Sequence, residues 1–127
     1  MSYQEEFEEE PKTLKLFVSI PMNGQSDEAV LHTQKVILEN VQEVTGKEYE
    51  LLNTLCHESR PQLPGIVNPQ IWYLTKSLNL LLDADLVVFH PFWTQARGCL
   101  VEHAICSLYN ISHVDLTMDY LFKPDKE

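Results

Sequence analysis

The chain has 127 residues, 44% of them hydrophobic, and a net charge of −10. This size and composition predict one globular domain with a single core. The negative charge argues against nucleic acid or an anionic membrane as a partner, because both repel an acidic surface. No apolar run reaches the roughly 18–20 residues that span a bilayer. The N-terminus is acidic, where a signal peptide would be basic and then apolar. We therefore expect a soluble, cytoplasmic protein.

Much of the charge lies in the first ten residues. Five of the 19 acidic residues lie between Glu5 and Glu10, whereas all nine basic residues follow Pro11. Residues 11–127 hold nine basic and 14 acidic residues, so their net charge is −5. Such a run is typical of a disordered, solubilising arm, and a partner-binding tail is the alternative. We therefore divide the chain into an acidic arm, residues 1–12, and one α/β domain, residues 13–127.

Strand and helix patterns alternate along this domain. The β-rich run 14–19 ends in turn-forming residues, and Ser26 is suited to cap a helix that Gly46 ends. Further strands are predicted at 49–53, 85–89 and 112–116, and further helices over 68–83, capped by Asn68 before Pro69, and from about Gly98 onward. The apolar stripes expected to face the core are Val30, Ile37, Val41 and Val44; then Ile71, Leu74, Leu78 and Leu81; then Val101, Ala104, Ile105 and Leu108.

This alternation is typical of a doubly wound parallel sheet. Right-handed crossovers favour the flavodoxin-like strand order 2-1-3-4, with about four to five strands in all. In that order the winding reverses between the first and third strands, and ligands bind at the carboxyl ends of those strands. Two loops meet there, residues 20–25 and 90–97. The sequence therefore predicts a ligand site between these loops.

Glu102 is the strongest candidate for chemistry in this region. It falls in the first turn or so of the third helix, at the edge of its apolar face and one turn after Gly98. Gly98 has no side chain, so a small ligand could approach the carboxylate from above. The alternative is a solvated glutamate that stabilises the helix dipole. Asp85, by contrast, begins a strand at the opposite end of the sheet, and we expect it to be structural.

The two loops supply the candidate ligand contacts. Backbone N–H groups between Ser19 and Gly24, at the start of the first helix, could hold a phosphate, although a plain βα turn looks the same. Arg97 is suited to a phosphate and Trp93 to the face of a base, and covering the edge of the core is the alternative for Trp93. The candidate substrate-binding residues are Ser19, Met22, Asn23, Gly24, His90, Trp93, Arg97 and Gly98.

The three cysteines predict neither a disulfide nor a metal centre. Cys99 and Cys106 are seven residues apart on one helix, about 10 Å of rise, which is too far for a bridge. Reduced thiols fit a cytosol-like compartment. Cys99, His103 and Cys106 share a helical stripe that could ligate zinc, with His57 or Cys56 as a fourth ligand, but two turns strain a tetrahedral site. We therefore expect packing cysteines, no metal and no cofactor.

Three segments carry motifs of a known family: Leu16-Phe-Val-Ser-Ile-Pro-Met-Asn-Gly24, Ala84-Asp-Leu-Val-Val-Phe89 and Trp93-x-x-x-Arg97-Gly98-x-x-x-Glu102-His103-x-x-Cys106. Over residues 14–116 the chain resembles the nucleoside 2-deoxyribosyltransferase-like superfamily, and most closely its small DUF4406-type proteins. The resemblance implies a flavodoxin-like fold, frequent oligomers and an N-glycosidic bond as the target. It further implies that Glu102 is the nucleophile, which attacks C1′ of a deoxyribose, and that the loop after the first strand contacts the sugar or its 5′-phosphate.

This chain departs from the family at three positions. Phe17 stands where the transferases carry a tyrosine, Ala96 where they carry an aspartate, and Lys76 or Ser77 where they carry another. A leaving base normally needs a proton. His90, His103 or a partner subunit could supply it.

The prediction is cleavage of a nucleoside or nucleotide N-glycosidic bond, or 2-deoxyribosyl transfer, with Glu102 as nucleophile. The alternative is a non-catalytic nucleotide-binding or sensing module on the same fold. We also expect a homo-oligomer, because the helix over 68–83 is rich in leucine, although such a stripe is more often core. Its leucines are Leu74, Leu78, Leu80, Leu81 and Leu82.

Overall fold

The computed structural model describes residues 13–55 and 68–118. Within them, four strands and three helices alternate, as expected for an α/β protein. The strands are β1 (Leu14–Ser19), β2 (Tyr49–Leu51), β3 (Leu86–Phe89) and β4 (His113–Asp115), and the helices are α1 (Asp27–Thr45), α2 (Pro69–Leu81) and α3 (Arg97–Leu108). A 3-10 turn, η2 (Trp93–Gln95), precedes α3 and was not predicted. The proposed acidic arm lies outside the described residues.

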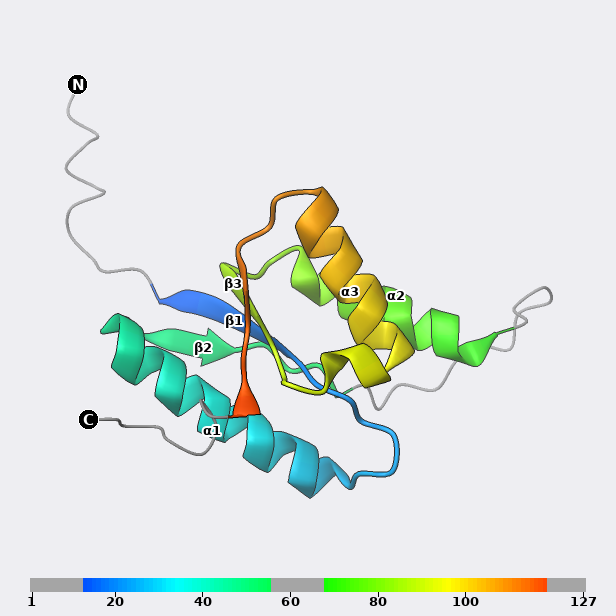
Figure 1. The fold of residues 1–127 in the computed structure, drawn as a ribbon, viewed down its shortest axis with the longest axis horizontal. Helices are drawn as coiled ribbons and strands as arrows, with labels where there is room; N and C mark the ends of the chain where they lie inside the picture. The colour runs from blue at the N-terminus through cyan, green and yellow to red at the C-terminus, as the bar shows by residue number, and fades with distance from the viewer. Residues whose placement is uncertain (1–12, 56–67, 119–127) are drawn as a thin grey trace.

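The four strands form one parallel sheet in the order β2-β1-β3-β4. This is the flavodoxin-like order predicted from the sequence. Figure 1 shows α1 on one side of the sheet and α2 and α3 together on the other. β1 and β3 are neighbours, and Ser19 pairs with Phe89 at their carboxyl ends. The two predicted loops therefore leave the sheet side by side.

Alternation along β1 decides which side chains meet which helices. Leu16 and Val18 pack into a core with Val30 and Ile37 of α1. Phe17 points to the other side, where it packs with Leu81 of α2 and Cys106 of α3. Successive side chains of a strand point to opposite faces of its sheet, so Ser19 lies on the same side as Phe17. The polar end of β1 is thereby presented to α2 and α3.

The helix ends follow the capping residues of the sequence. Ser26 Oγ accepts a hydrogen bond of 3.1 Å from the N–H of Ala29 at the start of α1. Asn68 Oδ1 accepts from the N–H of Gln70 at 2.9 Å at the start of α2, where Pro69 is the first helical residue. Gly46 ends α1 in the left-handed region with φ 70°. These local signals explain why the predicted ends of α1 and the predicted start of α2 are correct.

Gly46→Ala is expected to lower the free energy of unfolding by about 1–2 kcal/mol, because a Cβ disfavours the left-handed conformation. No atom lies within 4 Å of where that Cβ would be, so the loss measures backbone strain and not a clash. Urea unfolding of the variant checks the value. Lys47→Ala, at the next residue, is the matched control and should change stability by less than about 0.5 kcal/mol. Equal losses in the two variants would contradict the strain argument.

The predicted apolar stripe of α3 is wrong. Leu108 is 77% exposed and Val101 38%, whereas the buried residues of α3 are Cys99, Glu102 and Cys106. Large aromatic side chains of the sheet, including Phe17 and Phe89, fill the space beneath α3. In a close-packed core, these rings leave room for a short side chain such as Cys106 on the facing surface of the helix. Two end residues of the other stripes, Val44 and Ile71, are also exposed and not in the core.

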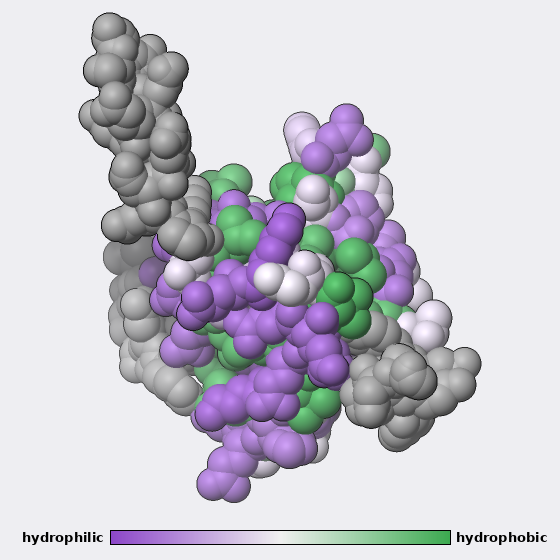
Figure 2. Space-filling model, turned by 90° about the vertical axis from the view of Figure 1, so that its left-hand side faces the viewer, coloured by the Kyte–Doolittle hydropathy of each residue, from purple (hydrophilic) through white to green (hydrophobic). Residues whose placement is uncertain are grey.

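Figure 2 shows one face of the molecule, on which hydrophilic side chains predominate and hydrophobic ones form small areas between them. Among residues 13–55 and 68–118, no helix combines the length and the apolar character needed to cross a membrane.

Candidate functional site

Glu102 lies buried above the carboxyl end of β1, with 6% of its surface exposed. Two hydroxyl groups hold its carboxylate. Ser19 Oγ donates to Oε1 at 2.7 Å, and Ser77 Oγ donates to Oε2 at 2.7 Å. Glu102 is the sixth residue of α3, in its second turn and not in its first. The interpretation of Glu102 as a solvated surface residue is therefore wrong, and the carboxylate joins β1, α2 and α3.

Burial raises the pKa of Glu102 above its ordinary value of 4.5, because removal from water disfavours the charged form. The hydrogen bonds from Ser19 and then Ser77 act in the opposite direction, since they stabilise the carboxylate. Desolvation therefore destabilises the charged form of Glu102, and the two serine hydroxyl groups partly offset this destabilisation. A carboxyl group with a shifted pKa in such a position is a common mark of functional chemistry.

This raised pKa predicts a specific dependence of stability on pH. Above pH 4.5 the unfolded chain loses the Glu102 proton, whereas the folded chain retains it until its raised pKa is reached. The free energy of unfolding should therefore fall as pH rises through this interval and then level off. Glu102→Gln should remove this component, because a glutamine does not titrate. Urea unfolding of both proteins from pH 4 to pH 8, with the exposed-residue variant Glu39→Gln as control, measures it. A constant difference between wild type and Glu102→Gln would contradict the raised pKa.

The start of α3 holds the predicted Arg97 and Gly98. Arg97 is exposed and its guanidinium donates to Gln70 Oε1 of α2 at 3.1 Å. A Cβ added at Gly98 would meet only the Leu74 side chain, at 3.9 Å, so α2 approaches α3 at this residue. The N-cap residue Ala96 offers no side-chain acceptor to the first turn. Free N–H groups of a helix start and an arginine both attract anions.

The end of β1 is buried, whereas part of the loop that follows it is exposed. Ser19 is buried against Glu102, and Met22 packs against the core on the α1 side of the sheet. Asn23 and Gly24 are exposed, and Gly24 has φ 79°. Of the four residues predicted here, only Ser19, the last residue of β1, contacts the Glu102 carboxylate. Asn23 and Gly24 remain accessible to a ligand.

The loop after β3 holds His90 and Trp93. The N–H of His90 donates to the Ser19 carbonyl at 2.9 Å, which places this histidine beside β1. Its Nδ1 accepts from the N–H of Phe92 at 3.0 Å. Burial lowers the pKa of His90 below 6.5. The neutral ring therefore carries its proton on Nε2.

Trp93 stacks on His103, with ring centroids 3.7 Å apart and planes 7° apart. One face of the indole is thereby occupied by an imidazole. Trp93 also packs against Phe89 in the core on the α2 and α3 side. These contacts fit the alternative role given to Trp93, in which its side chain covers the edge of the core.

Ser77 is the contact that sequence patterns missed. The sequence marks it only as one of two positions, Lys76 or Ser77, at which the 2-deoxyribosyltransferases carry an aspartate. Its distance of 25 residues from Glu102 gives no local signal, and only the packing of α2 on α3 joins them. Asp85 is structural as expected, since Oδ2 accepts from the N–H of Lys15 at 2.8 Å.

The cysteines of α3 do not bond to each other. Both Cys99 and Cys106 are free and buried. Burial raises the pKa of each thiol to about 11, with the Glu102 carboxylate adding to this shift. The thiols are therefore protonated at neutral pH and unreactive.

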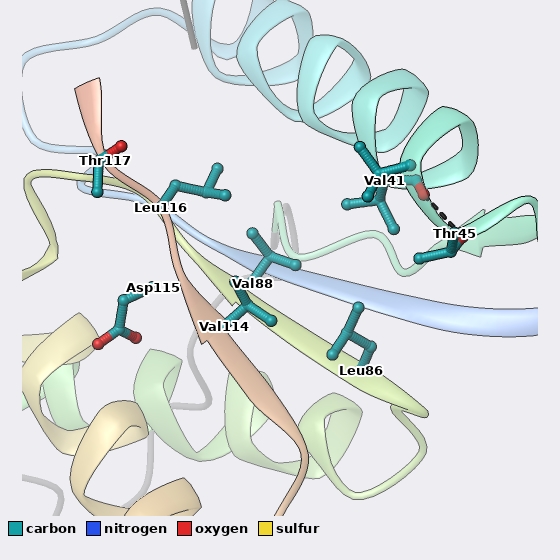
Figure 3. Close-up of a pocket in the computed structure, with 9 residues that line it drawn as sticks. Val41, Thr45, Leu86, Val88, Val114, Asp115, Leu116 and Thr117 are labelled. Carbon is teal, nitrogen blue, oxygen red and sulfur yellow. Dashed lines mark hydrogen bonds between the residues drawn. The ribbon is translucent and has the colours of Figure 1, made fainter. Parts of the chain in front are cut away.

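A groove of about 240 Å³ lies elsewhere, between α1 and β4 (Figure 3). The Val41, Val88 and Leu116 side chains face one another across it, and it has an apolar lining. It is on the α1 side of the sheet, opposite Glu102. Because catalysis needs polar groups, we assign the candidate site to the Glu102 carboxylate and not to this groove.

No protein-family model, no curated protein and no solved structure matches the chain. The interpretation of the site therefore depends on the sequence motifs and on the geometry of Glu102 and its neighbours.

Proposed function

We propose that this protein binds a nucleoside or nucleotide and cleaves its N-glycosidic bond, or transfers its 2-deoxyribosyl group, with Glu102 as the nucleophile. The observation that carries the proposal is the Glu102 carboxylate, buried above the carboxyl end of β1 and held by Ser19 and Ser77 at 2.7 Å each. A carboxylate fixed at the switch point of a parallel sheet is in the region where such folds bind ligands. The resemblance of the surrounding motifs to nucleoside 2-deoxyribosyltransferases supplies the reaction.

The proposed chemistry has two displacements. A Glu102 oxygen attacks C1′ and forms a glycosyl ester, while the C1′–N bond breaks and its electron pair leaves with the base. The base takes up a proton. Water or a second base then attacks C1′ and loses a proton to solvent, while the C1′–O bond breaks and its electron pair returns to the Glu102 carboxylate. Splitting one difficult displacement into two is the logic of retaining glycosidases, and it retains the configuration at C1′.

His90 is the better of the two histidines considered as a source of the proton. Its neutral ring carries hydrogen on Nε2 and lies beside the Ser19 backbone. His103 instead directs Nε2 to Asp115 at 3.0 Å and stacks on Trp93. Neutral imidazole is a weak acid, so His90 is suited to donating a hydrogen bond to the departing base.

Exposed groups at the start of α3 support a substrate with a 5′-phosphate. The first turn of α3 has no side-chain cap from Ala96, and Arg97 is exposed beside it. A phosphate would satisfy both the free N–H groups and the guanidinium. We therefore expect deoxynucleoside 5′-monophosphates to react faster than free deoxynucleosides.

The test is to incubate the purified chain with each deoxynucleoside and each 5′-monophosphate and to follow free base by chromatography. Base release from at least one substrate is the expected result. A second base added to the reaction distinguishes transfer, which yields a new nucleoside, from hydrolysis, which yields free sugar. If no substrate releases base under any condition, the enzymatic proposal is wrong.

The alternative is a non-catalytic nucleotide-binding module. The absence of the family's acidic residue at Ala96, and of its tyrosine at Phe17, favours this alternative. Phe17 is 1% exposed and belongs to the core, so it makes no polar contact with a ligand. Saturable binding of a nucleotide, measured by calorimetry, without any release of base would support the binding module.

We also propose that the chain forms a homo-oligomer through α2 and α3. These two helices expose several large apolar side chains on the side of the sheet away from α1, including Ile71, Tyr73, Leu100, Val101, Leu108 and Tyr109. Exposed apolar side chains on two neighbouring helices are typical of an interface. Sedimentation velocity distinguishes a dimer or larger assembly from a monomer, and a monomer at all concentrations would contradict this proposal.

A further inference from the structure

We propose that His103, His113 and Asp115 bind a divalent transition-metal ion of the zinc class. This site goes beyond the function proposed for Glu102 and does not depend on it. His103 belongs to α3, and His113 and Asp115 are the first and third residues of β4. Residues i and i+2 of a strand share a face, so both β4 side chains point toward α3. Among the described residues, these three offer ligand atoms that all lie within 4.8 Å of one another.

Figure 3 shows the direction of Asp115 in relation to its strand. Val114 and Leu116 line the groove beside α1, whereas the Asp115 carboxylate points to the other side of β4, toward the ribbon of α3. His103 Nε2 lies 3.0 Å from both Asp115 oxygens. The imidazole nitrogen is thus directed at the middle of the carboxylate and not at one oxygen.

His113 is prepared as a metal ligand by its backbone contact. Its Nδ1 lies 2.7 Å from the carbonyl oxygen of Ile111. A carbonyl only accepts hydrogen bonds, so Nδ1 must carry the proton, and Nε2 of the neutral ring has a free lone pair. Metal-binding histidines commonly donate their other ring N–H to a backbone carbonyl in this way, which fixes the tautomer and the ring orientation.

Aromatic contacts hold both rings in place. Trp93 stacks on His103 with ring centroids 3.7 Å apart, and Phe89 makes a T-shaped contact with His103 with ring centroids 4.7 Å apart. Phe89 also makes a T-shaped contact with His113 at 5.9 Å. The two imidazoles therefore keep little freedom to lose when a metal binds.

The donor set selects the class of metal. Two imidazoles and one carboxylate suit Zn²⁺ and its neighbours in the transition series, whereas Mg²⁺ and Ca²⁺ prefer oxygen ligands alone. With zinc–ligand distances of about 2.0–2.2 Å, tetrahedral ligand atoms lie about 3.3 Å apart. Closing the widest separation of 4.8 Å to that value requires a shift of about 1.5 Å. The Asp115 side chain is 43% exposed, so its carboxylate can move toward the two fixed imidazoles.

The ion would connect α3 to an edge strand. β4 has three residues and pairs only with β3 in the described sheet. Three protein ligands leave a fourth position of a tetrahedral ion open to water. Glu102 is the neighbour of His103 in sequence, but its side chain contacts Ser19 and Ser77. The metal would therefore stabilise the helix that carries Glu102 without coordinating that carboxylate.

The test is calorimetric titration of the untagged full chain with Zn²⁺ after chelator treatment. We expect one zinc per chain and a rise in melting temperature on binding. His113→Phe keeps the aromatic contact with Phe89 but removes the lone pair, and Asp115→Asn weakens the oxygen ligand at an exposed position. Each should lower zinc affinity at least about tenfold. His32→Phe, at an exposed residue of α1, is the matched control and should bind zinc like wild type.

Other donors of the chain are tested in the same experiment. Cys56 and His57 lie outside the described residues, so the titration is repeated in Cys56→Ser and His57→Gln. Co²⁺ should give the visible bands of a nitrogen and oxygen site, without a thiolate-to-cobalt charge-transfer band. The proposal is wrong if zinc does not bind saturably, if both His113→Phe and Asp115→Asn bind like wild type, or if Cys56→Ser abolishes binding. If His113→Phe does not fold, the zinc affinity of Asp115→Asn alone tests the proposal, and an affinity equal to that of the wild type contradicts it.

Discussion

Glu102→Gln is expected to lower the rate of base release at least about 10³-fold, because an amide cannot form the glycosyl ester. The substitution keeps the size of the side chain. The glutamine oxygen can accept from one of the two serines, Ser19 and Ser77, while its amide donates to the oxygen of the other. The fold should therefore be retained, and a loss of rate of this size, about 4 kcal/mol of activation free energy, would be chemical in origin.

Three measurements distinguish this role from a structural one. Mass spectrometry of the wild type quenched during turnover should find a deoxyribosyl adduct on Glu102, and the variant should show none. Ser77→Ala leaves the carboxylate with one donor fewer and should reduce kcat about tenfold with little change in KM, as expected for a positioning residue. Glu39→Gln, on the surface of α1, should be as active as wild type. If the wild type releases base and Glu102→Gln does so at a similar rate, Glu102 is not the nucleophile.

Phe89→Ala is expected to lower the free energy of unfolding by about 3–5 kcal/mol. Phe89 is fully buried at the end of β3 and packs in the core with Phe17 and Leu81. Its ring also contacts Trp93, His103 and His113. The substitution therefore removes apolar burial and leaves a cavity beneath three other rings. A loss of this size is a large part of the roughly 5–15 kcal/mol that stabilises a typical domain.

Phe92→Ala is the matched control for this prediction. Phe92 lies three residues later, is 43% exposed and contacts the ring of His90 at 5.4 Å. Its loss should cost less than about 1 kcal/mol. The midpoints of denaturant unfolding give both values, provided that the slope of the free energy against denaturant concentration is the same in the two variants. Similar losses in the two variants would contradict the assignment of Phe89 as the packing centre beneath α3.

The order and type of the elements could be predicted from the sequence because their signals are local. Ser26 and Gly46 bound α1 through contacts within four residues of the chain. β-branched and aromatic runs mark β1 and β3, and the alternation of strands and helices leaves few right-handed topologies. The same topology predicted that the loops after β1 and β3 would meet, and Ser19 and His90 are joined there by a backbone hydrogen bond.

The environment of each side chain in the site was decided by tertiary packing. α3 carries apolar residues on several sides, so its sequence could not indicate which face is buried. The bulk of Phe17 and Phe89 selects the face with Cys99, Glu102 and Cys106, and it turns Leu108 to solvent. That choice brings Glu102 to Ser77, 25 residues away, and His103 to Asp115. Such contacts depend on how volumes fit between a sheet and its helices, and short-range patterns of hydrophobicity do not encode that fit.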